Sequence, residues 1–257
     1  MNRIFTVLTA VALVLVIAQA PAQDKKGEKK ETPKIVVAAP LGVSAGVKTK
    51  VVVRGLKLDT ATEVRFFEPK VIAKVVKKEK VAVPNQQDPN RIGDSLVELE
   101  VQIPPEAAQP VLEFAIVTDK GESPPHKLLV NGELAPIAEK EPNNGLKQGT
   151  PVQIPQIVDG VINNAQDVDV FRIEGQAGQR LTFEVLAARY GSPVDSILTL
   201  YDDSGRIIAV NDDHNGTPDS RLEVTLPRTG AYALSLTDAH DLGGPQYVYR
   251  LVFDAAK

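Results

Sequence analysis

Apolar and polar residues alternate in many short segments of the chain beyond residue 33. In 95–103, Val97, Leu99 and Val101 are separated by polar residues. Segments 230–237 and 247–253 repeat the pattern, with Tyr, Leu or Phe at every second position. Successive side chains of a β-strand point to opposite faces, so this spacing predicts strands with one buried and one solvated face.

The segments that alternate, or that are rich in β-branched and aromatic residues, fall into two groups on either side of Pro136. The expected strands are 34–37, 49–54, 63–67, 95–103, 111–117 and 127–130, then 169–173, 180–188, 196–201, 206–211, 220–226, 230–237 and 246–253. Short strands separated by Gly and Pro predict an all-β fold of two β-sandwich domains. We expect the stretch beyond Pro136 to be one all-antiparallel sandwich of about eight strands.

The first residues have the organisation of a secretory signal peptide. A positive start at Arg3 is followed by an uncharged apolar run from Ile4 to Ile17 and by the small residues Ala20 and Ala22. We predict cleavage after Ala22, which leaves no stable membrane span, because no later stretch is apolar enough to cross a bilayer. The predicted organisation is a signal peptide at 1–22, a charged linker at 23–33, one sandwich at 34–132, a linker at 133–138 and a second sandwich at 139–254.

Composition excludes several classes of function. The formal net charge is −4 without a concentrated basic region, which argues against a nucleic-acid partner. The chain contains no Cys, so disulfides, thiolate metal sites and Cys nucleophiles are excluded. Trp is absent and aromatic residues are few, so both cores are built mainly from Val, Ile, Leu and Ala. The interleaved charges of the 23–33 linker are typical of a solvated tether, with contact to an anionic envelope as the alternative.

The first sandwich begins with a turn, Pro40-Leu41-Gly42, that precedes a strand ending in Gly55-Leu56-Lys57-Leu58. This opening resembles that of immunoglobulin-like TIG/IPT domains. The resemblance implies an Ig-like β-sandwich that serves as a spacer or interaction module. The Lys-rich stretch 74–80 and the polar loop 85–93 depart from that pattern.

The second sandwich carries a longer series of motifs in a fixed order. They are Glu141-Pro142-Asn143-Asn144, Gly160-x-Ile162, Asp167-Val168-Asp169-Val170-Phe171, Ala177-Gly178-Gln179-x-Leu181, Asp195-x-x-Leu198-x-Leu200-Tyr201-Asp202, Ala209-x-Asn211-Asp212-Asp213, Asp219-Ser220-x-Leu222 and Gly230-x-Tyr232. This order resembles the bacterial pre-peptidase C-terminal (PPC) domain. The resemblance implies a jelly-roll-like β-sandwich without catalytic activity, usually appended to secreted peptidases, although no peptidase segment precedes it here.

The same resemblance implies a calcium site. Some family members hold calcium with an acidic segment at the entrance of the domain and with Asp residues of a later strand. The matching positions here are Glu139, Glu141, Asn143, Asn144, Asp167 and Asp169. Carboxylate and amide oxygens are the ligands that Ca²⁺ takes, and a bound ion would stiffen the junction between the domains. The alternative is that Glu139 and Glu141 are solvated linker residues and Asn143 caps a turn.

No catalytic constellation is evident, and we expect no enzyme activity and no cofactor besides calcium. The acidic group at 202–216 lacks the EF-hand pattern and is rich in the residues of hairpin turns. His126, His214 and His240 lie in turn-like contexts, and Ser192 lacks the Gly-x-Ser-x-Gly elbow. We expect these His residues to be solvated.

The leading hypothesis is therefore an exported, non-catalytic binding or scaffold protein, periplasmic or extracellular. Its expected partner is another exported protein or an envelope polysaccharide. The first alternative is an accessory or inhibitory subunit of a separately encoded secreted peptidase. A remote alternative is a metal-dependent hydrolase, which a concave face that gathers Asp202, Asp212 and Asp213 with Asp167 and Asp169 would favour.

Overall fold

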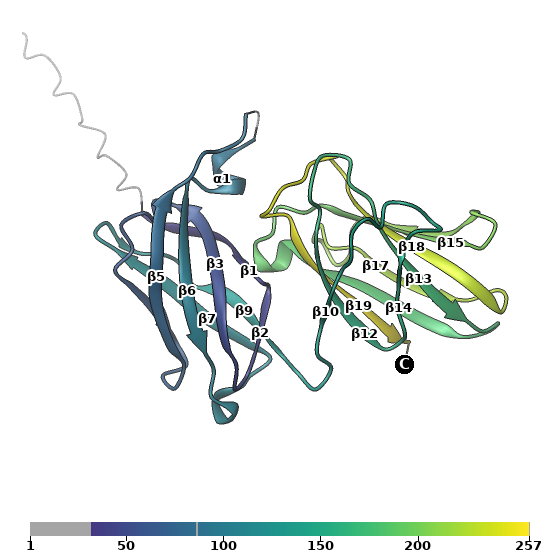
Figure 1. Cartoon of the computed structure of the whole chain (residues 1–257), viewed down its shortest axis with the longest axis horizontal. Coiled ribbons are helices and arrows are strands. Elements are labelled where there is room, and N and C mark those ends of the chain that lie inside the picture. The colour runs from purple at the N-terminus through teal and green to yellow at the C-terminus, as the bar shows by residue number, and fades with distance from the viewer. Residues whose placement is uncertain (1–31, 86, 257) are drawn as a thin grey trace, which may run out of the picture. The chain divides into compact units, whose positions relative to one another are not determined.

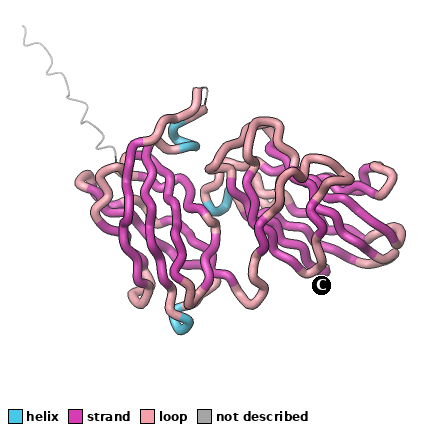
Figure 2. The backbone as a smooth tube through the Cα atoms, viewed as in Figure 1, coloured by secondary structure: helices cyan, strands magenta, loops and turns pink. Residues whose placement is uncertain are grey.

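The computed structural model describes residues 32–85 and 87–256. The predicted signal peptide and almost all of the 23–33 linker lie outside the described residues. Within them, regular structure is almost entirely β-strand, gathered in four sheets (Figures 1 and 2). The exceptions are α1 (Pro89–Ile92) and two short 3₁₀ turns, η1 (Pro105–Ala107) and η2 (Ala188–Tyr190). The all-β prediction is confirmed. No helix in this part of the chain is long and apolar enough to span a bilayer.

Residues 34–131 supply two of the sheets (Figure 1). Their strands are β1 (Lys34–Ala39), β2 (Gly42–Ser44), β3 (Lys48–Leu56), β4 (Glu63–Phe66), β5 (Ile72–Lys80), β6 (Ser95–Gln102), β7 (Val111–Thr118), β8 (Gly121–Glu122) and β9 (His126–Asn131). One sheet has the order β1-β3-β6-β5, and the other has β2-β9-β7-β4 with β8 beside β7. Val53 and Leu99 of one sheet and Phe114 and Leu128 of the other share one buried cluster, so the two sheets pack face to face.

Residues 137–255 supply the other two sheets. Their strands are β10 (Ile137–Ala138), β11 (Thr150–Pro151), β12 (Gln156–Val161), β13 (Asp169–Gly175), β14 (Arg180–Leu186), β15 (Ser196–Asp202), β16 (Ile207–Asn211), β17 (Arg221–Thr225), β18 (Gly230–Asp238) and β19 (Val248–Ala255). The orders are β10-β12-β19-β14-β17 and β11-β13-β18-β15-β16. Phe183 and Phe253 of one sheet pack with Phe171 and Leu234 of the other in a common core.

The alternation found in the sequence decides which faces are buried. Leu99 and Val101 of β6 are buried, while Glu98 and Glu100 on the opposite face pair with Lys50 and Lys48. In β19, Tyr249, Leu251 and Phe253 are all almost completely buried. Regular alternation thus identified these two strands and the side chains that face the core, although Val248 and Arg250 on the other face of β19 are buried too.

The predicted strands omit β12 and the short strands β2, β8, β10 and β11, and two further expectations are wrong. β5 was missed because its Lys-rich sequence does not alternate cleanly; it is an edge strand whose pairing with β6 shifts register between Val75 and Lys77. The stretch beyond Pro136 is not all antiparallel, because β10 pairs parallel to β12 and β11 pairs parallel to β13.

Both parallel pairs belong to one segment, residues 137–151, which we call the strap. Its first residues extend the edge of one sheet and its last residues extend the edge of the other. The strap must therefore cross from sheet to sheet along one side of the sandwich. The strap runs in the same direction as the edge strand that it joins in each sheet, so both pairings are parallel. Strands joined by a hairpin run in opposite directions and pair antiparallel.

Candidate functional site

The strap carries the first acidic residues of the site to the sandwich. Glu139 follows β10, and its N–H donates to the carbonyl of Asp159 in β12 at 3.0 Å. Further along, the carbonyl of Asn143 accepts from the N–H of Val170 in β13 at 3.1 Å. These contacts hold the intervening Glu141 over the start of β13, where Asp169 is the first strand residue.

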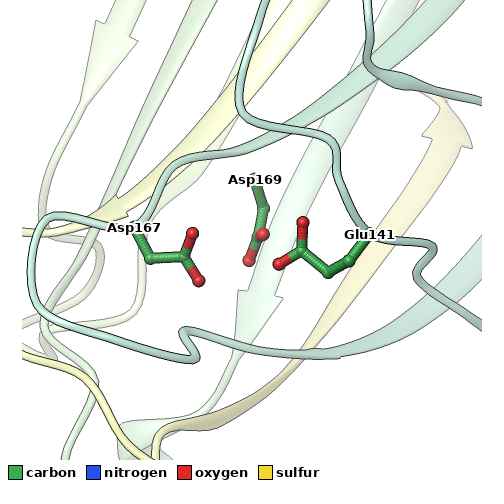
Figure 3. A group of neighbouring side chains, drawn as sticks. All are labelled: Glu141, Asp167 and Asp169. Atoms are coloured by element: carbon green, nitrogen blue, oxygen red, sulfur yellow. The ribbon is translucent and has the colours of Figure 1, made fainter.

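Three carboxylates meet at this point. Glu141, Asp167 and Asp169 each offer an oxygen, and these oxygens lie within 4.8 Å of one another. Figure 3 shows the three carboxyl groups directed toward a common space. Asp167 and Asp169 are buried, whereas Glu141 is exposed. Three clustered carboxylates repel one another strongly unless protons or a cation compensate their charge.

Amide groups surround the Asp167 carboxylate. Its Oδ1 accepts from Asn144 Nδ2 at 3.1 Å, and its Oδ2 accepts from the backbone N–H of Asn163 at 2.7 Å. Asn163 Nδ2 also donates to Glu141 Oε1 at 3.0 Å. The amides therefore orient both carboxylates toward the shared space.

Tyr249 links the remaining acidic residue to the group. Its hydroxyl lies 2.6 Å from Glu139 Oε2 and 2.8 Å from Asp169 Oδ2. Glu139 Oε1 accepts from the N–H of Val161 at 2.6 Å. Gly160 lies beside this triad and has no room for a side chain, because a Cβ there would stand 2.3 Å from the Tyr249 hydroxyl. Glu139 is thus half-buried and hydrogen-bonded rather than solvated.

Some polar atoms at the site have no partner within the described part of the chain. Asn143 is completely buried, and neither its Oδ1 nor its Nδ2 makes a hydrogen bond there. Asp169 Oδ1 is likewise buried and unpartnered. Buried polar atoms are almost always satisfied, so the unpartnered oxygens of Asn143 and Asp169 are candidate ligands for a cation. Carboxylate and amide oxygens without nitrogen or sulfur ligands fit calcium.

The pKa values of the buried groups show how strongly the site disfavours negative charge in the absence of a cation. Burial, together with the nearby Glu139 carboxylate, raises the pKa of Asp169 to about 9. Burial also raises the pKa of Glu139 and of the Tyr249 phenol. Without a cation, the group lowers its charge by retaining protons; a divalent cation favours the ionised form instead.

All six residues expected at the calcium site therefore lie in one region, although their roles differ. Tyr249 and Asn163 were not anticipated. Alternation did predict a buried ring for Tyr249, and a buried Tyr hydroxyl usually has a hydrogen-bond partner. The identity of that partner was not encoded in any local pattern, because Glu139 and Asp169 lie far away in sequence.

The second acidic group is separate from this site. Asp202 accepts hydrogen bonds from Ser204 and Arg206 and pairs with Arg228 at 2.7 Å. The Ser204 hydroxyl bond is the main reason that its pKa falls to about 2. Asp212 and Asp213 are exposed. Among the described residues, the carboxylate group around Asp167 and Asp169 does not include any of these three.

The expectation that all three His residues are solvated is wrong for His126. It begins β9 and packs edge-on against Phe114, with ring centroids 5.7 Å apart. Burial lowers its pKa to about 4, so the ring is neutral at ordinary pH. His240 is exposed and lies 3.5 Å from Asp195.

Comparison with known proteins gives one family match, the "Bacterial pre-peptidase C-terminal domain", over residues 167–238. The chain is 33% identical over 125 residues to a probable subtilase-type serine protease of Deinococcus radiodurans, an alignment that covers 47% of this chain and 17% of that protein. The chain thus spans less than a fifth of this relative.

Two solved structures illustrate the structural comparison. The pre-peptidase C-terminal domain of a Bacillus anthracis collagenase is 14% identical, with a TM-score of 0.35 over 45% of this chain and 99% of that one. The periplasmic lysozyme inhibitor PliG of Aeromonas hydrophila is 12% identical, with a TM-score of 0.31 over 47% and 100%. Scores this low do not establish a common fold. The family match extends from Asp167 through β18, so the chain contains a bacterial pre-peptidase C-terminal domain within residues 167–238.

Proposed function

We propose that this protein is an exported, non-catalytic binding module whose second sandwich is stabilised by one calcium ion. The observation that carries the calcium assignment is the buried, unpartnered Asn143 side chain beside three converging carboxylates. Glu141, Asp167 and Asp169 would supply the charged oxygens, and Asn143 would supply an amide oxygen. Glu139 and Asn144 support the group through Tyr249 and Asp167.

The ion would cross-link the strap to the sandwich. Glu141 and Asn143 belong to the strap, whereas Asp167 and Asp169 belong to the turn before β13 and to β13 itself. Calcium supplies positive charge at the point where like charges otherwise repel. Its binding would thus fix the segment that leads into the domain.

Calcium titration of the metal-free protein, followed by thermal melting, tests this assignment. A ligand that binds only the native state stabilises it by about 2.7 kcal/mol at a hundredfold excess over Kd. Asp169→Asn and Glu141→Gln should lose most of the response, whereas Asp213→Asn, an exposed acid outside the group, should keep it. An unchanged melting temperature at millimolar calcium would remove calcium from the proposal.

The remaining role is that of a scaffold. The predicted signal peptide supports export. The first sandwich would serve as a spacer that presents the second sandwich to another exported protein or to an envelope polysaccharide. Affinity capture from the envelope fraction, with the calcium-loaded full chain as bait, identifies the partner class. Capture that Asp169→Asn abolishes and Asp213→Asn retains would connect the calcium site to binding.

A second candidate is an accessory or inhibitory subunit of a secreted peptidase. The specific observation in its favour is the similarity of about half of this chain to part of a probable subtilase-type serine protease. The test is to measure the activity and half-life of a co-encoded exported peptidase with and without the purified chain. No change in either quantity, and no complex by gel filtration, would eliminate this candidate.

A further inference from the structure

Asn144 is followed by Gly145 in the strap, at the edge of the carboxylate group. The Asn144 side chain is exposed, and its Nδ2 donates to Asp167 Oδ1 at 3.1 Å. Among the hydrogen bonds of the described residues, none uses the backbone N–H or C=O of Asn144 or the N–H of Gly145. No backbone hydrogen bond therefore opposes the rotation that brings the Gly145 nitrogen to the amide carbon of Asn144, and only the bond to Asp167 must be released.

We propose that Asn144 is a site of spontaneous deamidation, which places a new carboxylate beside the metal ligands. The backbone nitrogen of Gly145 attacks Cγ of Asn144 and forms a five-membered succinimide, while the side-chain nitrogen leaves as ammonia. Water then adds to one of the two ring carbonyls and breaks its bond to the Gly145 nitrogen. The net change is Asn and water to Asp, or to isoaspartate, and ammonia; no oxidant or reductant is involved.

Gly145 permits this attack because it has no side chain next to the nucleophilic nitrogen. Asn is also among the chemically labile residues of proteins. The chain offers two further Asn-Gly sequences, Asn131-Gly132 and Asn215-Gly216, which serve as internal references.

At both reference sites the backbone around the Asn is held more tightly than it is at Asn144. Asn131 is the last residue of β9, where it pairs with Ser44 and donates to the Ser44 hydroxyl at 2.9 Å. Asn215 has a left-handed backbone with φ of 52°. It lies inside a turn that is closed by two hydrogen bonds between His214 and Thr217. A fixed backbone hinders the rotation that brings the glycine nitrogen to Cγ, so Asn144 should react before either.

The new carboxylate would change the site in opposite ways with and without a cation. Asn144 now donates to Asp167, whereas an Asp at this position would repel it at the same short distance. With calcium bound, the extra carboxylate places negative charge beside the ligand set, which strengthens binding. This second step rests on the proposed calcium site; the deamidation itself does not.

Peptide mapping by mass spectrometry tests the proposal on the full chain. The protein is incubated at mildly alkaline pH with calcium or with a chelator, and amide-to-acid conversion is measured over time at residues 131, 144 and 215. We expect conversion to be fastest at residue 144 and to be slowed by calcium, which holds the strap. Conversion at residue 215 with none at residue 144 would overturn the proposal.

Gly145→Ala is the matched control. The atoms nearest to a Cβ at Gly145 all belong to the Gln148 side chain, the closest being Oε1 at 3.5 Å, an ordinary contact. The variant should therefore fold and bind calcium as the original does. Because its methyl group shields the nitrogen, conversion at residue 144 should slow on the order of tenfold, with residue 215 unchanged. Equal rates in the two proteins would exclude the succinimide route.

Asn144→Asp separates the two parts of the inference. This variant should bind calcium on the order of tenfold more tightly and melt at a lower temperature in chelator. If residue 144 of the original protein converts at the same rate with and without calcium, and neither the original protein nor Asn144→Asp binds the ion, the calcium assignment fails while the deamidation stands. If calcium binds but residue 144 never converts, the deamidation fails alone. Should the variant not fold, the aged protein separated by charge provides the same comparison.

Discussion

At the scale of single residues, the site depends on one hydroxyl that serves two carboxyl groups. Tyr249 is buried between Glu139 and Asp169 and contacts both. Tyr249→Phe removes the hydroxyl and leaves Glu139 Oε2 and Asp169 Oδ2 without this hydrogen-bond partner. A buried polar atom that loses its partner costs about 1–3 kcal/mol, so we expect a loss of that size in the free energy of unfolding by urea. Tyr201→Phe, on a half-exposed ring of β15, is the control and should change it by less than about 0.5 kcal/mol.

Asp169 should also give the metal-free protein an unusual dependence on pH. Its pKa in the folded chain, about 9, lies above the value of about 3.9 for an unfolded chain. The folded state therefore keeps a proton that the unfolded state has released, and stability falls as the pH rises from about 4 to about 9. For this one proton, the free energy of unfolding should fall by at most about 1.4 kcal/mol per pH unit.

Urea unfolding in chelator across this pH range measures the slope. Asp169→Asn, which cannot ionise, should flatten it, and calcium should also flatten it in the original protein because the ion favours the charged carboxylate. If the free energy of unfolding depends on pH in the same way in the variant and in the original protein, Asp169 ionises normally.

At the scale of elements, a buried carboxylate fixes the turn between β14 and β15. Asp219 accepts from the N–H groups of Ala187 and Ala188 at 3.1 and 2.7 Å and from Arg189 Nε at 2.7 Å. Asp219→Ala leaves these donors without an acceptor, so unfolding by urea should require about 3 kcal/mol less. Asp203→Ala, on a mostly exposed side chain, should have little effect. Equal losses in the two variants would contradict this role of Asp219.

The elements also show what the sequence can and cannot predict. Alternation located β6, β18 and β19 and identified their core-facing side chains. The expected solvated face is wrong for β18 and β19, where residues of the opposite face, such as Ser235 and Arg250, are buried as well. It missed β5, whose exposed Lys74 pairs across the sheet with Glu100 at 3.0 Å. The partner of an edge strand lies elsewhere in the chain, so a Lys-rich sequence alone resembles a loop.

The candidate site could also be predicted only in part from the sequence. Its six residues could be proposed because motif order aligned them with a family. The strap that assembles them could not, since it is anchored by two-residue pairings with β12 and β13 and has no pattern of its own. The link from Tyr249 to Glu139 and Asp169 joins positions 110 and 80 residues apart. Such contacts follow from tertiary packing rather than from local sequence.

At the scale of the whole molecule, the proposed ion should act on one sandwich only. Its ligands all lie between residues 141 and 169, whereas the sheets of residues 34–131 share no strand with those of 137–255. Hydrogen exchange with and without calcium measures this directly. Protection should rise in the strap, in β12 and at the start of β13, and stay unchanged in β3, β6 and β7. Hydrogen exchange reports the stability of each cooperative unit. An equal increase in protection in both groups of strands on calcium binding would therefore mean that they unfold as one. The two predicted domains would then be a single cooperative unit, and calcium would stabilise the chain as a whole.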